Sequence, residues 1–381
     1  MGDVAVIGVG MSRFTTYQGT KDIEDLGYEA TTKALEDADI AWKQVQAAFC
    51  GSALSGNVVG HRVLNLVGMT GIPIVNVENA CSSSGSAFRL AYQSIASGRY
   101  DVCLALGVDV VPRGLILDAS WPIYQRVMGF NVEPASYAMN ARRHMADYGT
   151  TIEQIAKVTV KNRKNGSLNK YCHFQKEVAV EEVLASRLIS DPLRLLMCCP
   201  NAEGGSAAIL VNSRKFKRTK AVIVAASVLT SSMFGSPGTD VGMGTIMTPI
   251  NPDRTEAAAK EAYELAGLGP EDLDLVETHD AFASAEISHY ERLGLCGKGE
   301  GGRLIDEGVT AINGKIPVNP SGGLMSRGHP VGATALAQAA EIVWQLRGEA
   351  GPRQIPHARV GLAHTLGGGP NCSIIILKGQ R

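Results

Sequence analysis

The sequence predicts an α/β fold: two duplicated α/β halves, each a mixed sheet covered by helices, packed in layers, with an inserted loop domain in the first half. Short apolar runs alternate with stretches of helical periodicity, as expected for strands of a largely parallel sheet and the helices that connect them. The order of these elements then repeats in the second half of the chain. The length of 381 residues is sufficient for both copies.

The first half begins with an apolar run at residues 4–9, predicted as a strand, which ends in Gly8-Val9-Gly10. Position 13 is Arg13, so the third glycine of a dinucleotide-binding fingerprint is missing. The further elements predicted for this half are a helix over 26–38, strands over 45–50 and 101–108, a helix that follows Cys81 and ends near 97, and a closing strand over 207–211.

The second half repeats this order. Alanines at 258, 262 and 266 match those at 30, 34 and 38 at a constant offset, within a predicted helix over 256–268. The other repeated elements are strands over 221–229, 272–277 and 359–364, and a helix that opens at 332–335. We therefore assign residues 1–215 to an N-terminal half and 216–381 to a C-terminal half. The inserted loop domain spans about 111–191, with helices expected over 136–147 and 152–162.

Charge and cysteine usage exclude several classes of function. Lys+Arg 36 against Asp+Glu 37 gives no basic excess, so a nucleic-acid partner has no support. The 8 cysteines include no C-x-x-C pair and no metal-ligand spacing, which predicts reduced thiols, no metal site and a cytoplasmic protein. We expect no membrane span, because the sequence has no basic leader before an apolar stretch and no uninterrupted apolar run of about 18 residues.

Cys81 lies where an apolar, strand-like approach meets a helical pattern, among small residues that leave room for a substrate. A cysteine at a helix start is close to unpaired N–H groups and to the positive end of the helix dipole. This position predicts a lowered pKa and a nucleophilic thiolate. The alternative is a structural cysteine that packs as a small hydrophobic residue in the core.

Three histidines fall where a ligand is expected. Ligands of α/β sheets bind at the carboxyl ends of strands, beside helix N-termini. In the second half these places carry His279, His329 and His364, three of the 8 histidines in the chain. A single histidine there is more often a hydrogen-bonded structural residue, but three that converge on one cysteine favour catalysis.

These motifs, in this order, resemble the thiolases over essentially the whole chain. The resemblance rests on the segment 79–85 around Cys81, on His279-Asp280-Ala281-Phe282, on the sequence GHPVGAT at 328–334, and on the glycines at 367–369. Many thiolases have Asn-Glu-Ala-Phe where this chain has His-Asp-Ala-Phe. The latter is similar to the sterol-carrier-protein-type and archaeal branch, including acetyl-CoA acetyltransferases.

The resemblance implies an acyltransferase that cleaves 3-ketoacyl-CoA or condenses two acyl-CoAs. Cys81 would form an acyl-enzyme while His329 draws off the thiol proton, and His329 and His279 would polarise the thioester of the second substrate. The N–H groups of Cys81 and Gly367 would form the oxyanion hole. Acyl-CoA and CoA enter as substrates, and no permanently bound cofactor is implied.

One departure from the family concerns carbon–carbon bond chemistry. Many thiolases carry a second cysteine in a Cys-x-Gly-Gly-Gly element, but aligning the glycines places Thr365 there. Sterol-carrier-type relatives can use a cysteine at the position of Ala281. The neighbouring His364 is the remaining candidate, although strand alternation can turn it to the opposite face. The sequence therefore supports the acylation half of the mechanism better than the other half.

Two other functions are compatible with the fold. A thiolase-like retro-aldolase acting on a sterol-type CoA thioester would not need the missing cysteine, but the retention of Cys81 argues against it. A non-catalytic acyl-CoA or lipid-binding subunit is the third candidate, with activity supplied by a small OB-fold, zinc-ribbon partner. The resemblance also implies a homodimer or tetramer. The basic runs 161–164 and 215–218 suit phosphate binding or, more often, a solvated face.

Overall fold

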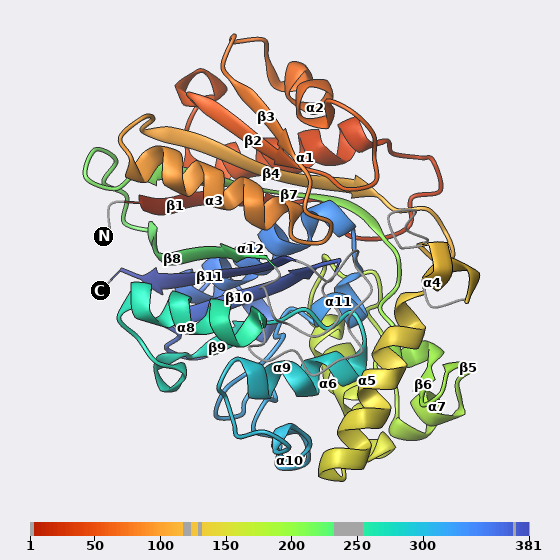
Figure 1. The fold of residues 1–381 in the computed structure, drawn as a ribbon. Helices are drawn as coiled ribbons and strands as arrows, with labels where there is room; N and C mark the ends of the chain where they lie inside the picture. The colour runs from red at the N-terminus through yellow and green to blue at the C-terminus, as the bar shows by residue number, and fades with distance from the viewer. Residues whose placement is uncertain (1–3, 117–122, 129–131, 232–253, 369–370, 381) are drawn as a thin grey trace.

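The computed structural model describes residues 4–116, 123–128, 132–231, 254–368 and 371–380 (Figure 1). It confirms the predicted α/β fold. Nine strands form one mixed sheet, which contains the strands of both halves. In sheet order they are β3 (Ile74–Val77), β2 (Ala47–Gly51), β4 (Val102–Val110), β7 (Glu203–Asn212), β1 (Val4–Met11), β8 (Val222–Thr230), β11 (Asn371–Gly379), β10 (Val360–Gly367) and β9 (Leu275–Glu277).

The sheet is itself duplicated about the junction of β1 and β8. Outward from β1, antiparallel pairing with β7 and β4 is followed by parallel pairing with β2 and β3. Outward from β8, antiparallel pairing with β11 and β10 is followed by parallel pairing with β9 and the bridge residue Val318. The halves meet at the pairs Ala5–Ile223 and Val6–Val222. The repeat seen in the sequence is therefore a repeat of strand order and direction.

Helices cover the outer faces of both halves, and two helices lie between the halves (Figure 1). These two helices share one buried core with strands of both halves. Cys81 precedes the first of them and His329 precedes the second, so the packing of two equivalent helices brings a thiol and an imidazole together. The helices are α1 (Ile23–Ala38) and α2 (Val59–Val67) outside the first half, α8 (Arg254–Ala266) and α9 (Ala283–Arg292) outside the second, and α3 (Ser83–Ala96) and α12 (Thr334–Arg347) between them.

The glycines of β1 allow α1 to pack closely against it. A Cβ atom at Gly8 would lie 2.3 Å from the carbonyl oxygen of Ala34, and one at Gly10 would lie 2.2 Å from that of Ala30. α1 itself begins at a capping box formed by Asp22 and Asp25. The Gly-x-Gly pattern thus serves the contact between helix and strand.

The inserted residues fold mainly as helices beside the second half. α5 (Glu133–Tyr148) and α6 (Ile152–Ser167) contain the two helices predicted there. α6 starts at a capping box of Thr151 and Gln154 and packs against α9. Within the described residues, no helix combines the length and the apolar character needed to cross a membrane. The remaining elements are α4 (Ile123–Val127), α7 (Val180–Ala185), β5 (Leu188–Ser190), β6 (Leu193–Arg194), α10 (Gly301–Asp306) and α11 (Gly323–Arg327).

Candidate active site

Cys81 lies in the loop between β3 and α3, just before the helix begins at Ser83. Ala80 has a left-handed backbone conformation with φ of 48°. The hydroxyl of Ser83 donates a hydrogen bond to the carbonyl of Ala80 at 2.6 Å, which tightens the turn. The hydroxyl of Ser82 donates to the carbonyl of Thr365 on β10 at 3.1 Å. The loop of the first half is thus tied to a strand of the second, which fixes the position of the thiol.

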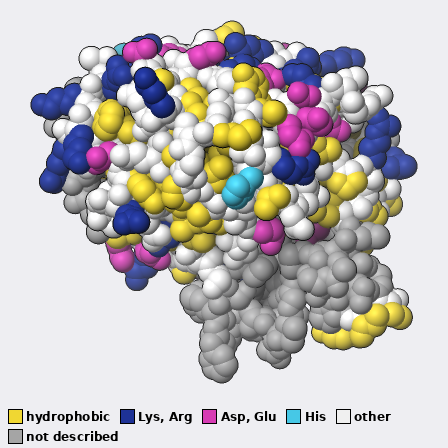
Figure 2. Space-filling view, turned by 90° about the horizontal axis from the view of Figure 1, so that it is seen from above, with side chains coloured by type: hydrophobic (Ala, Val, Ile, Leu, Met, Phe, Trp, Pro, Cys, Tyr) yellow, Lys and Arg dark blue, Asp and Glu magenta, His cyan; other side chains and the backbone are white. Residues whose placement is uncertain are grey.

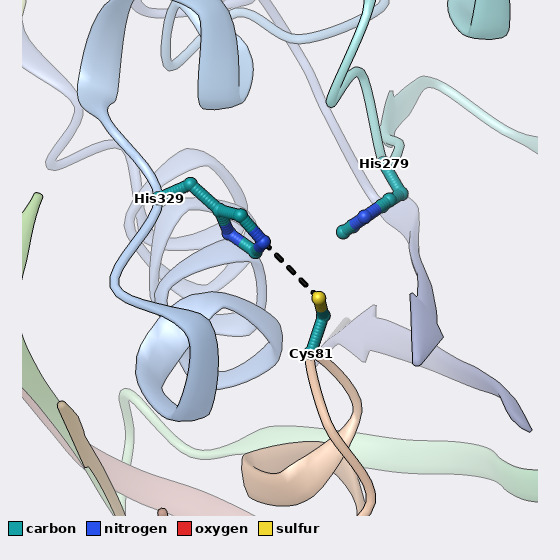
Figure 3. A group of neighbouring side chains, drawn as sticks. All are labelled: Cys81, His279 and His329. Carbon is teal, nitrogen blue, oxygen red and sulfur yellow. Dashed lines mark hydrogen bonds between the residues drawn. The ribbon is translucent and has the colours of Figure 1, made fainter. Parts of the chain in front are cut away.

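His329 faces this thiol from the loop between α11 and α12 (Figure 3). Its Nε2 atom lies 3.1 Å from Sγ of Cys81. Its Nδ1 atom lies 2.7 Å from the hydroxyl oxygen of Thr334. That hydroxyl donates its own hydrogen to the carbonyl of Pro330 at 2.9 Å, so its oxygen accepts from Nδ1–H. The Nε2 lone pair is therefore directed at Cys81, in the arrangement of a general base and its nucleophile.

His279 completes the group from the loop that follows β9 (Figure 3). Its ring lies 5.2 Å from the ring of His329, in an edge-to-face arrangement with an interplanar angle of 79°. Cys81, His279 and His329 each contribute one sulfur or nitrogen atom to a group whose members all lie within 4.8 Å of one another. The structure therefore brings together three of the predicted site residues, with the thiol from the first half and both imidazoles from the second.

The resting thiol is neutral. Burial raises the pKa of Cys81 to about 12, and the carboxylate of Glu133 adds to this effect. The backbone amides of Gly368 and Cys81, which donate hydrogen bonds to the sulfur, offset only part of the shift. The prediction of a lowered pKa was therefore wrong. α3 begins beyond the cysteine, and the loss of solvent around the sulfur outweighs the helix dipole.

The two imidazoles are neutral as well. Burial, followed by the charge of Arg327, lowers the pKa of His329 to about 3. Burial and the neighbouring His329 hold the pKa of His279 well below its usual value. A neutral thiol beside a neutral imidazole reacts by transferring its proton as the sulfur attacks, so no preformed thiolate is required.

Two glycines of β10 and its turn shape the other side of the sulfur. A Cβ atom at Gly367 would lie 2.3 Å from the carbonyl oxygen of Asn79, so only glycine allows this approach to the Cys81 loop. Gly368 has φ of 52°, and its amide donates toward the sulfur. This donor is one residue beyond the predicted Gly367, whose own amide role stays a prediction. Gly369 lies outside the described residues.

His364 and Thr365 point to opposite faces of β10. The hydroxyl of Thr365 donates to Gln338 on α12. The Nδ1 atom of His364 lies 2.8 Å from the hydroxyl oxygen of Thr278, on the side of β9. After burial and His329, His364 is the next cause of the lowered pKa of His279. His364 thus influences the site electrostatically, and its role as a proton carrier stays a prediction.

A buried polar network joins the His279 loop to the inserted helices. The carboxylate of Asp280 accepts hydrogen bonds from the amide of Leu324 at 2.7 Å and from Nδ2 of Asn162 at 2.8 Å. The same Nδ2 atom donates to Glu286 at 2.6 Å. Burial and the charge of Glu286 raise the pKa of Asp280 to about 7. Asn162 of α6 therefore helps to set the position of the loop that carries His279.

The basic run at 161–164 mostly faces the protein interior. Nζ of Lys161 lies 2.7 Å from a carboxylate oxygen of Glu286. The guanidinium of the buried Arg163 lies 3.7 Å from the centre of the Phe174 ring, a cation–π contact. Lys164 is the exposed member. Phosphate binding and a solvated face were both wrong as interpretations of Lys161 and Arg163, because the apparent run places successive residues on different faces of α6.

The segment 199–200, which no sequence pattern singled out, also borders the site. The amide of Cys199 donates to the carbonyl of Ala281 at 2.9 Å, and the amide of His329 donates to the carbonyl of Pro200 at 3.1 Å. The segment is therefore held between the two histidine-bearing loops. Burial raises the pKa of the Cys199 thiol well above its usual value, and the charges of Asp280 and Cys81 contribute. No short motif could reveal this segment, because its neighbours are distant in the sequence.

Two family models together match most of the chain. The model of the thiolase N-terminal domain matches residues 4–210, and a model described as thiolase C-terminal domain-like matches residues 242–379. The chain is 42% identical to an acetyl-CoA acetyltransferase of Methanothermobacter thermautotrophicus, over 97% of both chains. It is 39% identical to sterol carrier protein 2 of Oryctolagus cuniculus, over 98% of this chain and 72% of that protein.

A solved structure described as an Ltp2-ChsH2(DUF35) aldolase has the same fold. It superposes with a TM-score of 0.84 at 24% identity and covers 100% of this chain and 98% of its own. At this identity the similarity concerns the fold alone.

Proposed function

Because this chain belongs to the thiolase family, we propose that it is an acyl-CoA acyltransferase that forms an acyl-enzyme on Cys81 and either cleaves 3-ketoacyl-CoA or condenses acyl-CoAs. The observation that carries the proposal is the 3.1 Å contact between Sγ of Cys81 and Nε2 of His329. The nitrogen is unprotonated, because Nδ1 carries the hydrogen that is donated to Thr334. A thiol and a base in this arrangement suit nucleophilic attack on a thioester.

The first half-reaction follows from these contacts. In the condensing direction, Sγ attacks the thioester carbonyl of the first acyl-CoA while Nε2 of His329 takes the thiol proton, and the departing CoA thiolate then takes this proton from Nε2. The amides of Cys81 and Gly368, which both lower the pKa of the Cys81 thiol, would receive the oxyanion of the tetrahedral intermediate. The product is a Cys81 thioester, enclosed by the small residues of the loop.

The second half-reaction needs a group that exchanges a proton with the α-carbon of the incoming or leaving acyl-CoA. We assign this role to Cys199. Its backbone is fixed to the His279 loop through Ala281, and its thiol interacts electrostatically with that of Cys81. The hydroxyl of Thr365 is engaged by Gln338 on α12. His279 would polarise the thioester of the second substrate.

The retro-aldolase remains the second candidate. The relatives include sterol carrier proteins, and the structure described as an Ltp2-ChsH2(DUF35) aldolase shares the fold. The acyltransferase is favoured because an aldol cleavage leaves the thioester intact and has no use for a thiol aligned with a base. A non-catalytic lipid-binding role gives the Cys81–His329 contact no use either.

An apolar surface supports the proposal of a homodimer. Figure 2 views the face over α2 and β3, where hydrophobic side chains gather. Leu66 and Met69 are exposed at 57% and 84%, and Val75 on β3 at 41%. β3 is also an edge strand, whose free backbone groups can pair with another chain. A second copy is the proposed occupant of this face. A small OB-fold, zinc-ribbon protein is a further proposed partner.

Mass spectrometry tests the proposed reaction directly. The full chain is incubated with acetyl-CoA or acetoacetyl-CoA, and intact mass and peptide mapping locate any adduct. We expect one acyl group on the Cys81 peptide of the wild type and of the control variant Cys198→Ser, and none on that peptide of Cys81→Ser. Absence of an adduct on the wild type, or an equal adduct on Cys81→Ser, would overturn the proposal.

A further inference from the structure

The three reactive side chains of the site also form a set of metal ligands. The donor atoms of Cys81, His279 and His329 lie within 4.8 Å of one another, although their spacing in the sequence matches no metal motif. We propose that this group binds one Zn²⁺ ion through the thiolate and the two imidazoles, and that bound zinc prevents acylation. This inference goes beyond the acyltransferase proposal, because it concerns a ligand that the reaction does not use.

The spacing suits a tetrahedral ion after small side-chain movements. Zinc binds sulfur at about 2.3 Å and imidazole nitrogen at about 2.0–2.1 Å, so donor atoms around it are roughly 3.3–3.6 Å apart. The observed separation of Sγ and the His329 nitrogen is 3.1 Å, and no separation in the group exceeds 4.8 Å. Rotation about the Cα–Cβ bond of Cys81 would move the sulfur relative to both rings. Three protein ligands leave the fourth position for water or for an anion.

The surroundings leave both imidazoles available as ligands. Thr334 accepts the Nδ1 hydrogen of His329, which leaves Nε2 with a free lone pair, as a metal requires. His279 is 2% exposed, and its Nδ1 atom is buried with no hydrogen-bond partner among the described residues. Within the described part of the chain, this nitrogen is therefore not committed to another group. Figure 3 shows both rings beside the sulfur of Cys81.

The binding step is balanced by the release of one proton. The neutral Cys81 thiol gives up its hydrogen to solvent, sulfur and two imidazole nitrogens bind Zn²⁺, and the site gains one positive charge. The lone pair of sulfur that would attack a thioester is then held by the metal. Cys81 is half-buried and therefore not fully enclosed by the protein. The acyl-enzyme, in which this sulfur is already esterified, lacks the thiolate ligand.

Calorimetric titration of ZnCl₂ into the reduced, metal-free full chain tests the proposal. We expect one ion per chain for the wild type and for Cys198→Ser, because the thiol of Cys198 donates to the carbonyl of Arg194. Removing a ligand in Cys81→Ser or His279→Ala should weaken binding at least about 10-fold to 100-fold. Alkylating Cys81 of the wild type with iodoacetamide should also abolish binding, which keeps the test decisive if a variant fails to fold.

Two results would overturn the zinc site. One is a wild type that binds no Zn²⁺, and the other is binding of equal affinity after Cys81 has been alkylated. If the wild type still gains an acyl group from acetyl-CoA in those cases, the acyltransferase proposal stands and only the zinc site fails. Conversely, specific zinc binding without acylation would support the site and contradict the proposed reaction.

Discussion

The hydroxyl of Thr334 accepts a hydrogen bond from Nδ1 of His329 at 2.7 Å, while it donates to the carbonyl of Pro330 at 2.9 Å. The direction of the second bond determines that of the first. One hydroxyl at the start of α12 therefore selects the tautomer of His329 and aims its basic nitrogen at Cys81, 3.1 Å away.

Replacing Thr334 by valine should slow acylation of Cys81 about 10-fold to 100-fold, as is typical when the partner that orients a reactive histidine is removed. The fold should survive, because valine has nearly the same shape. Thr334→Ser keeps the hydroxyl and should retain the rate within a few-fold. Rapid-quench mass spectrometry of the acyl adduct measures both rates. Equal rates for the valine and serine variants would contradict the orienting role.

Acylation should show no loss of rate from ionisation of His329 between pH 8 and pH 5. The pKa of His329 is lowered to about 3, so the ring stays basic as the pH falls through this range. A base with the ordinary pKa near 6.5 would lose about 30-fold in its active fraction by pH 5. Single-turnover acylation at several pH values distinguishes the two. A fall centred near 6.5 would show that the imidazole is not desolvated.

Alkylation provides the matching test of the thiol. The pKa of Cys81 is raised to about 12, so its thiolate fraction grows with pH throughout the range from 7 to 10. The rate of reaction with iodoacetamide should therefore rise about tenfold per pH unit without reaching a plateau. Peptide mapping separates this site from the other cysteines. A plateau below pH 9 would indicate a preformed thiolate.

Asn162→Ala should destabilise the protein, because it removes a buried donor from both Asp280 and Glu286. Both carboxylates keep other donors, such as the amide of Leu324 for Asp280 and Nδ2 of Asn319 for Glu286, so the loss is that of one buried, charge-assisted donor, roughly 1–3 kcal/mol. The matched control is Lys164→Ala on the same helix, whose exposed side chain should change stability by less than about 0.5 kcal/mol. Denaturant unfolding measures both changes. Similar free energies of unfolding for the two variants would show that the hydrogen bonds of Asn162 do not stabilise the fold.

Gly367→Ala should impair both stability and acylation. Its Cβ would lie 2.3 Å from the carbonyl oxygen of Asn79, so the Cys81 loop must move. Overpacking of this kind costs roughly 1–3 kcal/mol. Gly379→Ala on the adjacent strand is the control, because the nearest atom to its Cβ would be 3.7 Å away. Thermal unfolding and the adduct assay should separate the variants. A Gly367→Ala variant that stays active and stable would show that residue 367 does not lie so close to the carbonyl of Asn79.

Cys199→Ser should separate the two half-reactions. A serine hydroxyl is too weak an acid to replace a thiol, so thiolysis of acetoacetyl-CoA should fall roughly 100-fold or more, the usual contribution of a general acid or base. With acetyl-CoA as the donor, the acyl adduct on Cys81 should form at a nearly unchanged rate, because CoA then leaves as a thiolate and no carbon is protonated. Cys198→Ser should leave both steps intact. Full thiolysis activity in Cys199→Ser would remove Cys199 from the mechanism.

The duplication was the part of the fold most accessible from sequence. The spacing of alanines in the two equivalent helices is retained because α1 packs on β1 and β7 as α8 packs on β8 and β11 of the same sheet. Two elements were missed, although one of them, β11, has the place in the second half that β7 has in the first. β11 is an apolar run that follows the glycine cluster, and α9 is a short helix with a mixed face. Neither has the sustained periodicity on which such predictions depend.

Within the site, residue types were predictable and their environments were not. Cys81, His279 and His329 stand out because reactive side chains follow strand ends. The pKa of Cys81 was mispredicted because burial of its thiol, which depends on how the whole chain packs, raises the pKa more than the backbone amides lower it. Cys199 escaped notice for the same reason: what places it is a backbone hydrogen bond to Ala281.

The contact between α3 and α12 has a consequence for how this protein tolerates change. Gly85 at the start of α3 approaches Ala335 on α12 so closely that an added Cβ would lie 3.3 Å from the alanine methyl. The loop before α3 carries the sulfur of Cys81, and the loop before α12 carries the basic nitrogen of His329. A larger side chain between α3 and α12 would lengthen the distance between Sγ of Cys81 and Nε2 of His329 without removing either reactive group. Variants at this contact should therefore lose acylation rate before they lose melting temperature.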